Sequence, residues 1–319
     1  MFSLNTILSK GWDDFKSNPI LLVPGLLAGS LSIIFAVVLF WAMFGDIMQA
    51  IAMTSSSTAS TMFLDPNYFD SFIDSFNVVR FLLIFIVSMI LLVIVSVFIE
   101  AGLTGMAKEA VEKGTTTFGD FLSYGAKYFL KFLAYSIVIG IIVGIPVAII
   151  AIIFIAFIAV IVATGSIALA ILAYFVFLIL IIIVALIVTL FFYFIPYAIV
   201  IDEMGVMDSI SKSYRIFMDN KGDVFIFILI VGIISFAVSF VVGIFTGILG
   251  IIPIVGAILS LIISIIVTAV LSALSAVWST RAYYMLTDET VYEQPVCEQE
   301  FSEYAEIEEG ILTDEPEQV

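Results

Sequence analysis

The sequence contains no histidine and only one cysteine, Cys297. Without histidine, the chain can form no imidazole general base, no Ser-His-Asp triad and no histidine-ligated haem. A single cysteine excludes an internal disulfide framework and the usual Cys/His zinc sites. These absences remove a large share of enzyme chemistry, and we predict a non-enzymatic protein without a cofactor.

Charged residues are also scarce. They make up 12% of the 319 residues, while hydrophobic residues make up 63%; soluble domains have about 25% and roughly 45–50%. Residues 132–201 and 224–280 contain no Asp, Glu, Lys or Arg at all. Because one helical span needs about 20 apolar residues, each block can hold two spans. The predicted fold class is an all-α, polytopic membrane protein.

Six transmembrane helices are predicted. Their expected bounds are Ile20–Met43, Arg80–Thr104, Lys131–Ala163, Ile167–Ile201, Val224–Leu249 and Pro253–Thr280. With six spans, ten of the 11 Lys and Arg residues fall on one side, and only Arg80 lies at the other. Basic residues mark the cytoplasmic side. We therefore expect a multi-pass plasma-membrane protein whose N- and C-termini are both cytoplasmic.

The predicted organisation is a membrane domain over 1–285, with an outer loop at about 44–79, followed by a tail over 286–319. The net charge of −16 belongs mainly to this tail, because 12 of the 27 acidic residues and no basic residue lie in 288–319. Such a composition is typical of a solvated, disordered segment. A basic cytoplasmic partner is one role for it.

The segment before the first span resembles the segment before the fifth. Positions 9–18 read SKGWDDFKSN and positions 211–220 read SKSYRIFMDN, and a weaker third copy, SYGAKYFLKF, starts at Ser123. The pattern predicts three helix-hairpin repeats, at about 1–104, 105–202 and 203–285, each preceded by a cytoplasmic amphipathic helix. The plainer alternative is that any cytoplasmic loop of a membrane protein is basic and aromatic. The predicted interfacial anchors are Trp12, Tyr124, Tyr214, Lys212 and Arg215.

Small residues recur every four positions in several spans, and such rows let helix backbones approach closely. A polar stripe lining a water path is the alternative, but no charge joins the rows. The predicted packing residues are Gly25, Gly29, Gly140, Gly144, Ser235, Ser239, Gly243, Gly256, Ser260, Ser264 and Thr268.

Three carboxylates are weak candidates for a polar site: Glu100, Asp202 and Glu203. Glu100 lies near the cytoplasmic end of the second span and Lys131 near the start of the third; the two either form an interfacial pair or are ordinary boundary charges. Asp202 and Glu203 precede Gly205, which predicts a glycine cap at the end of the fourth span. If the three carboxylates converged on one pocket, an enzyme acting on lipid headgroups would be the better interpretation.

The stretch FFYFIPYAIVIDEMGVMDSISKSYRIFMDNKGDVFIF, residues 191–227, is the most specific part of the chain. It resembles uncharacterised prokaryotic six-span membrane proteins, including the membrane domain fused to glycerophosphoryl diester phosphodiesterases. The resemblance implies the fold of 1–285. It implies no activity, because the phosphodiesterase chemistry resides in a separate barrel with histidines, which this chain lacks.

The favoured function is an accessory, scaffold or membrane-organising component. A permease or channel for a hydrophobic or lipid-like solute is the first alternative, and a cavity lined by Ser264, Thr268 and Ser235 would support it. The expected partners are membrane lipids and either a second copy or another membrane protein; no nucleic acid is expected.

Overall fold

The computed structural model describes residues 2–53, 78–164, 167–252 and 254–287, and within these ranges the chain is helical without strands. The helices are α1 (Leu4–Ser17), the short 3-10 helix η1 (Pro19–Leu21), α2 (Leu22–Met53), α5 (Val78–Lys113), α6 (Phe118–Thr164), α7 (Ile167–Phe192), α8 (Ile195–Ile201), α9 (Val206–Asp219), α10 (Lys221–Leu249) and α11 (Val255–Leu286). Six of the described segments are long and apolar enough to cross a membrane. The chain is therefore a multi-pass membrane protein, as predicted.

Several helices extend beyond their predicted ends. Helix α2 continues to Met53 and α5 to Lys113. Helix α6 has 47 residues, about 70 Å at 1.5 Å per residue, so it is far longer than a hydrocarbon core of about 30 Å. The rest of the predicted outer loop, 54–77, residues 165–166 between α6 and α7, and the acidic tail from 288 onward lie outside the described residues.

The expectation of a separate amphipathic helix before the third span is wrong. The segment that starts at Ser123 is the first part of α6 and continues into the span without interruption. The reason is local: α1 and α9 stop at Asn18 and Asn220, but no asparagine or proline separates Ser123 from the apolar run. Pro146 lies inside α6 and does not break it either.

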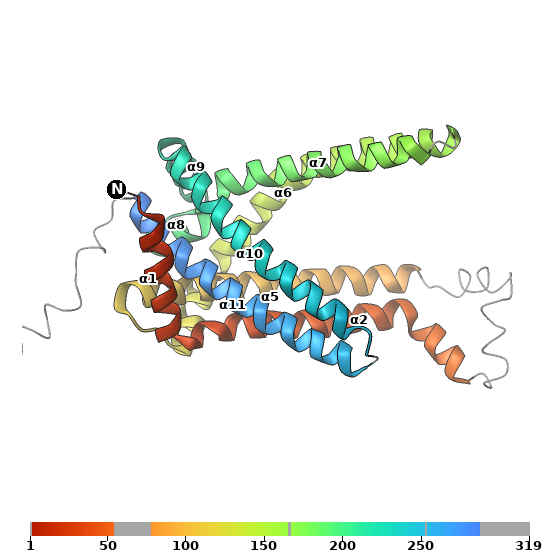
Figure 1. Cartoon of the computed structure of the whole chain (residues 1–319), viewed down its shortest axis with the longest axis horizontal. Helices are drawn as coiled ribbons and strands as arrows, with labels where there is room; N and C mark the ends of the chain where they lie inside the picture. Colours follow the sequence, from red (N-terminus) through yellow and green to blue (C-terminus); the bar gives the residue numbers. More distant parts are fainter. Residues whose placement is uncertain (1, 54–77, 165–166, 253, 288–319) are drawn as a thin grey trace, which may run out of the picture.

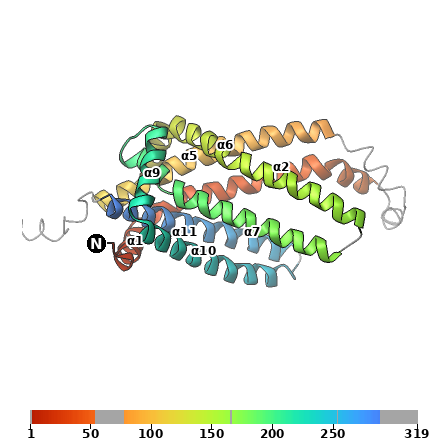
Figure 2. The same cartoon turned by 90° about the horizontal axis from the view of Figure 1, so that it is seen from above.

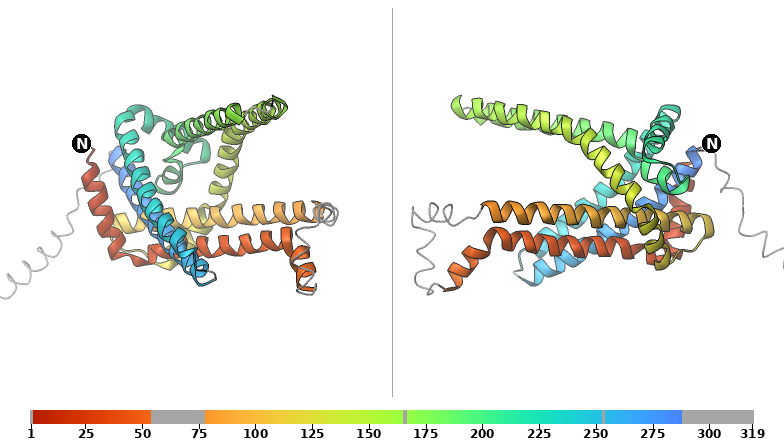
Figure 3. Two further views of the ribbon diagram at one scale, coloured as in Figure 1. Left: turned by 45° about the vertical axis from the view of Figure 1, so that its right-hand side comes forward. Right: turned by 180° about the vertical axis from the view of Figure 1, so that it is seen from behind.

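Helices α2, α5, α10 and α11 run along the long axis of the molecule, while the pair α6 and α7 diverges from α2 and α5 toward the end remote from α1 (Figures 1 and 3). Seen from above, the long helices lie side by side (Figure 2). Helices α1, α8 and α9 gather at one end of the bundle (Figure 1), which we call the capped end.

Buried side chains concentrate toward the capped end. Ile7 of α1, Phe194 from the break between α7 and α8, and Tyr283 of α11 are fully buried in one cluster. By contrast, Ile251, in the turn between α10 and α11, is 79% exposed. Packing within the chain is therefore densest at the capped end, and the remote ends of the helices present apolar side chains outward, as lipid-facing helices do.

Candidate functional site

A partly open cavity of about 420 Å³ lies between helices at the capped end, and Glu100 is on its wall. Glu100 stands in α5, between the buried residues Ile99 and Ala101, yet it is itself exposed to the cavity. Ionisable residues inside membrane spans are rare because they are costly there, and they mark functional sites by default. Glu100 is therefore the centre of the candidate site, which we call the Glu100 cavity.

Five segments of the chain form the wall of this cavity. They are α5, α6, the end of α7, the Tyr193–Tyr197 region around the break, and α11. The residues on the wall are Glu100, Leu103, Thr104, Tyr135, Ile139, Val188, Thr189, Phe192, Tyr193, Pro196, Tyr197, Ser272, Ser275 and Ala276. The wall thus combines one carboxylate with tyrosine, serine and threonine hydroxyls on an apolar background, which is the usual make-up of a small-molecule site.

Three hydroxyls of the wall donate to their own helices. Thr104 Oγ1 donates to the carbonyl of Glu100 at 2.8 Å, Thr189 Oγ1 to Ala185 O at 2.8 Å, and Ser272 Oγ to Ala269 O at 3.0 Å. Each hydroxyl has one proton to donate and two lone pairs that accept. With the protons engaged, these oxygens can act toward the cavity only as acceptors.

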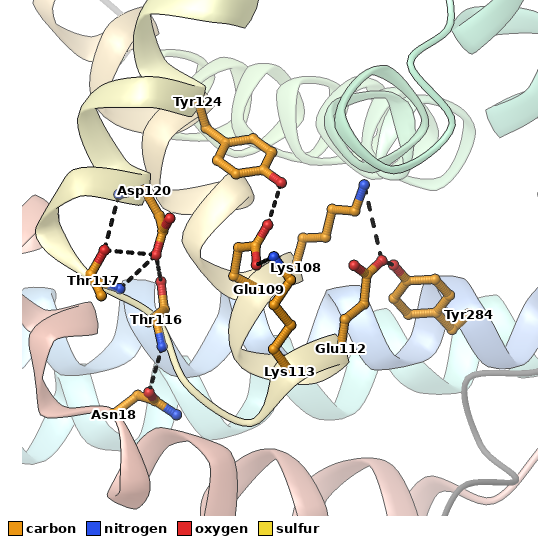
Figure 4. A network of polar contacts seen from close by, with 10 residues as sticks. All are labelled: Asn18, Lys108, Glu109, Glu112, Lys113, Thr116, Thr117, Asp120, Tyr124 and Tyr284. Carbon is orange, nitrogen blue, oxygen red and sulfur yellow. Dashed lines mark hydrogen bonds and ion pairs between the residues drawn. The ribbon is translucent and has the colours of Figure 1, made fainter.

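The other acidic residues of α5 and its turn are paired, as Figure 4 shows. Glu109 accepts from Tyr124 at 2.5 Å and pairs with Lys113 at 2.6 Å. Glu112 accepts from Tyr284 and lies 4.0 Å from Lys108. In the following turn, Asp120 accepts from the Thr117 backbone N–H at 2.7 Å. The Asn18 side chain accepts from Thr116 N at 2.9 Å and donates to Gly114 O at 3.0 Å.

The Glu100 carboxylate differs from these, because no hydrogen bond or ion pair reaches it from the described part of the chain. The interfacial pair with Lys131 is not formed. Lys131 instead donates to the backbone carbonyls of Glu203 at 2.7 Å and Met204 at 3.0 Å. The unwound turn after α8 offers these carbonyls, and they attract the ammonium away from Glu100.

The three candidate carboxylates do not converge on one pocket. Asp202 accepts hydrogen bonds from Lys212 and Tyr283, and Glu203 accepts from Lys127 at 2.7 Å and Tyr128 at 3.1 Å. Neither lines the Glu100 cavity. The hydrogen bonds from Lys127, and then from Tyr128, hold the pKa of Glu203 below its usual value.

The predicted glycine cap after the fourth span is not formed at Gly205. Glu203 itself takes the left-handed conformation, with φ 56°, whereas Gly205 has φ −71° and starts α9. A non-glycine residue with positive φ is strained. Hydrogen bonds hold it in that conformation: Lys127 and Tyr128 donate to its carboxylate, and Lys131 donates to its backbone carbonyl.

The predicted interfacial anchors separate into two groups. Trp12 is 42% exposed and Tyr214 46% exposed, and Arg215 is exposed too. Tyr124 and Lys212 point inward: the Tyr124 ring covers Gly105, and Lys212 pairs with Asp202. The buried residues of α9 are Ser209, Ser213 and Ile216, and Phe217 is partly buried against the same core.

The predicted packing residues also differ among themselves. A Cβ on Gly25 would lie 2.5 Å from Ala269 Cα, one on Gly29 would lie 2.8 Å from Ile265, and one on Gly256 would meet Leu249 O, so these glycines are in close contact. Ser260 donates to Thr246 O of α10 at 3.3 Å. The remaining members are Gly140, Gly144 and Gly243, whose added Cβ would meet nothing within 4 Å among the described residues, the exposed Ser239, Ser264 and Thr268, and the half-buried Ser235.

Sequence reasoning missed most of the cavity wall. Tyr135, Tyr193 and Tyr197 lie in charge-free blocks and were read only as parts of spans. The sequence signal for a polar site was the presence of tyrosine hydroxyls within the spans, because such a hydroxyl needs a polar partner inside a membrane. Tyr193 has one, since its hydroxyl lies 2.7 Å from Ser279 Oγ.

A second hollow, of about 300 Å³, lies between α6 and α7. Its lining is entirely apolar and includes Phe154 and Phe177, whose ring centroids are 4.1 Å apart. An apolar hollow of this kind can accommodate a lipid acyl chain, and its lining residues have no polar side chain that could recognise a headgroup.

Residues 2–286 match the model of a family described as a domain of unknown function, DUF7847. No curated protein and no solved structure matches the chain.

Proposed function

The chain belongs to the DUF7847 family, and we propose that it is a non-enzymatic membrane protein that binds a lipid-like solute in the Glu100 cavity. The observation that carries this proposal is the cavity itself, which is about 420 Å³ in volume and has a carboxylate without a partner among the described residues on its wall. Pockets for small molecules have volumes of about 300–1,000 Å³.

The cavity favours binding of a solute over the scaffold function expected from the sequence. A scaffold needs no carboxylate inside the membrane. An unpaired carboxylate there destabilises the fold and adds no packing contact that would offset the cost. The cavity is not the one anticipated for a permease, because Ser264, Thr268 and Ser235 are absent from its wall. Its residues come instead from the capped end, so the proposed site is nearer one membrane surface.

Catalysis on lipid headgroups is less well supported. That function required Glu100, Asp202 and Glu203 to share one pocket, and they occupy three separate environments. Asp202 and Glu203 are engaged with lysines and tyrosines. In the proposal these two carboxylates stabilise the capped end.

The proposed architecture remains a threefold repeat of helix hairpins. Aligning Ser9, Ser123 and Ser211 places the same kinds of environment at matching positions. Four matched sets follow from this alignment: Ile7, Phe121 and Ser209; Gly11, Gly125 and Ser213; Asp14, Tyr128 and Ile216; and Asn18, Phe132 and Asn220. The first two sets are fully buried, and the other two contain only buried or half-buried residues. One shared inward face is what a repeat requires.

The proposed orientation places the capped end, and both termini, at the cytoplasmic side of the plasma membrane. The basic residues support it, since Lys108, Lys127 and Lys212 bind Ile201 O, Glu203 and Asp202, at the end of α8 and in the turn that follows it. Membrane lipids are the proposed partners. A second copy, a basic partner of the acidic tail and the relation to the phosphodiesterase membrane domain stay predictions.

A cavity-filling variant tests the proposed function. In Thr189→Trp the new ring would occupy the cavity, whereas Ile187→Trp places the same ring on an exposed position of α7 outside it. Native mass spectrometry of protein extracted gently from its own membrane should find a defined bound lipid or small molecule on the wild type and on Ile187→Trp, and not on Thr189→Trp. Equal retention by all three proteins would contradict the proposal.

A further inference from the structure

We infer that the solute of the Glu100 cavity carries a protonated amine, and that Glu100 is its counter-ion. This inference rests on the proposed function, and it adds the chemical class of the ligand. It is argued from the charge, the hydrogen-bonding capacity and the size of the cavity.

Among the described residues, no lysine or arginine pairs with Glu100. Five lysines from α5, α6 and α9 are engaged elsewhere: Lys108 with Glu112 and Ile201 O, Lys113 with Glu109, Lys127 with Glu203, Lys131 with two backbone carbonyls, and Lys212 with Asp202. A carboxylate removed from water either takes up a proton or gains a positive partner, because an unpaired charge there is costly. A cation from outside the chain can be that partner.

The wall also favours a ligand that donates hydrogen bonds. The hydroxyls of Thr104, Thr189 and Ser272 donate to their own helices, so they present acceptor oxygens to the cavity. An ammonium group has several N–H donors and no acceptor. It therefore matches the Glu100 carboxylate and these three acceptor oxygens, whereas an anionic phosphate or carboxylate headgroup would be repelled by an ionised Glu100.

The size and lining of the cavity favour an organic cation over a metal ion. A volume of about 420 Å³ is far larger than one ion needs. In the described residues no group of three or more His, Cys, Asp or Glu side chains could hold a metal. Tyr135, Tyr193 and Tyr197 also line the cavity, and aromatic rings attract organic cations.

The experiment uses two photoreactive probes with the same diazirine-bearing alkyl chain, one ending in a primary amine and one in an alcohol. The full-length protein is placed in phosphatidylcholine nanodiscs at pH 7, and labelled peptides are mapped by mass spectrometry. We expect the amine to label α5, α7 and α11 at a concentration about ten-fold lower than the alcohol, the factor that one charged hydrogen bond of about 1.5 kcal/mol gives.

Two variants separate charge from shape. In Glu100→Gln the preference for the amine should disappear while labelling by the alcohol persists. In Glu203→Gln, which removes an exposed carboxylate at the same end but outside the cavity, the preference should remain. Parity of the two probes on the wild type would overturn the inference even if Glu100→Gln failed to fold.

The possible outcomes also separate a failure of the amine inference from a failure of the proposed binding function. Equal cavity labelling by both probes, reduced for both by Thr189→Trp, would sustain the binding function and refute the amine. Loss of both probes in a Glu100→Gln protein that melts like the wild type would make Glu100 a residue that only shapes the cavity, which also refutes the amine. Labelling of the cavity by neither probe would refute the binding function together with the inference.

Discussion

At the scale of residues, the carboxylates near the capped end are distinguished by their neighbours rather than by their sequence context. Glu203 is on the surface, where Lys127 and Tyr128 donate to it. Asp202, one position earlier, faces Lys212 and Tyr283. Glu100 faces a cavity with no partner in the described chain. The three acids therefore differ: two join segments of the fold, and Glu100 lines a cavity without a partner among the described residues.

The ion pair of Glu203 predicts a dependence of stability on pH. Since Lys127 and Tyr128 lower its pKa from the usual 4.5, the ionised form stabilises the fold above that value, and the contribution is lost as the pH falls through the lowered pKa. The difference in melting temperature between wild type and Glu203→Gln should be small and present at neutral pH, and it should vanish in acid. Melting curves in nanodiscs over a pH series measure it.

A difference that persisted unchanged in acid would show that Glu203 acts through its conformation. Its positive φ of 56° would then be the feature that the substitution disturbs.

At the scale of elements, the break between α7 and α8 brings the cavity and the capped end together. Helix α7 ends at Phe192 and α8 begins at Ile195, with Pro196 in its first turn. Ser213 of α9 fits into this break: its hydroxyl donates to Phe191 O at 2.8 Å and accepts from Phe194 N at 3.3 Å. One buried hydroxyl thus satisfies two backbone groups that the break leaves without helical partners.

Substitution of that hydroxyl should destabilise the protein. Ser213→Ala leaves a buried N–H and a carbonyl unpaired, at a cost of about 1–3 kcal/mol. Ser211→Ala is the control, since Ser211 is exposed and donates only to Met207 O of its own helix; its effect should stay within about 0.5 kcal/mol. Denaturant titration in mixed micelles compares the two. Equal stability of both variants would mean that α9 does not hold the break.

At the scale of the whole molecule, the helices are closely packed at the capped end and diverge at the remote end (Figure 1). Close approach depends on small residues: Gly25 meets Ala269, and Gly11 lies under the ring of Trp278. Toward the remote end, Gly140, Gly144 and Gly243 meet no neighbour within the described chain. The faces that carry them are left to lipid or to a second copy.

The two ends of α10 give a test of the proposed orientation. The helix has 29 residues, about 43 Å at 1.5 Å per residue, so it connects opposite membrane surfaces. In a Cys297→Ser background, Ile251→Cys should react with an impermeant maleimide added to intact cells, and Asp219→Cys only after permeabilisation. The reverse pattern would place the capped end outside the cell.

The sequence by itself determined the class of the protein, the number of spans and the distribution of charge. These follow from local properties, because a run of about 20 apolar residues is a span wherever it occurs and because lysines stay on the side where they are synthesised. The ends of α1 and α9 were also readable, since Asn18 and Asn220 stop both helices.

Only the tertiary structure decided which small residues are in contact, which partner Lys131 takes and where Glu100 faces. The cavity joins residues as distant as Glu100, Tyr135, Thr189 and Ser272. Nothing in the local pattern of any one helix specifies the rotation and spacing of the others. The divergence of α6 and α7 and the break before α8 set those distances, and they place a carboxylate that could be an ordinary boundary charge on the wall of the proposed binding site.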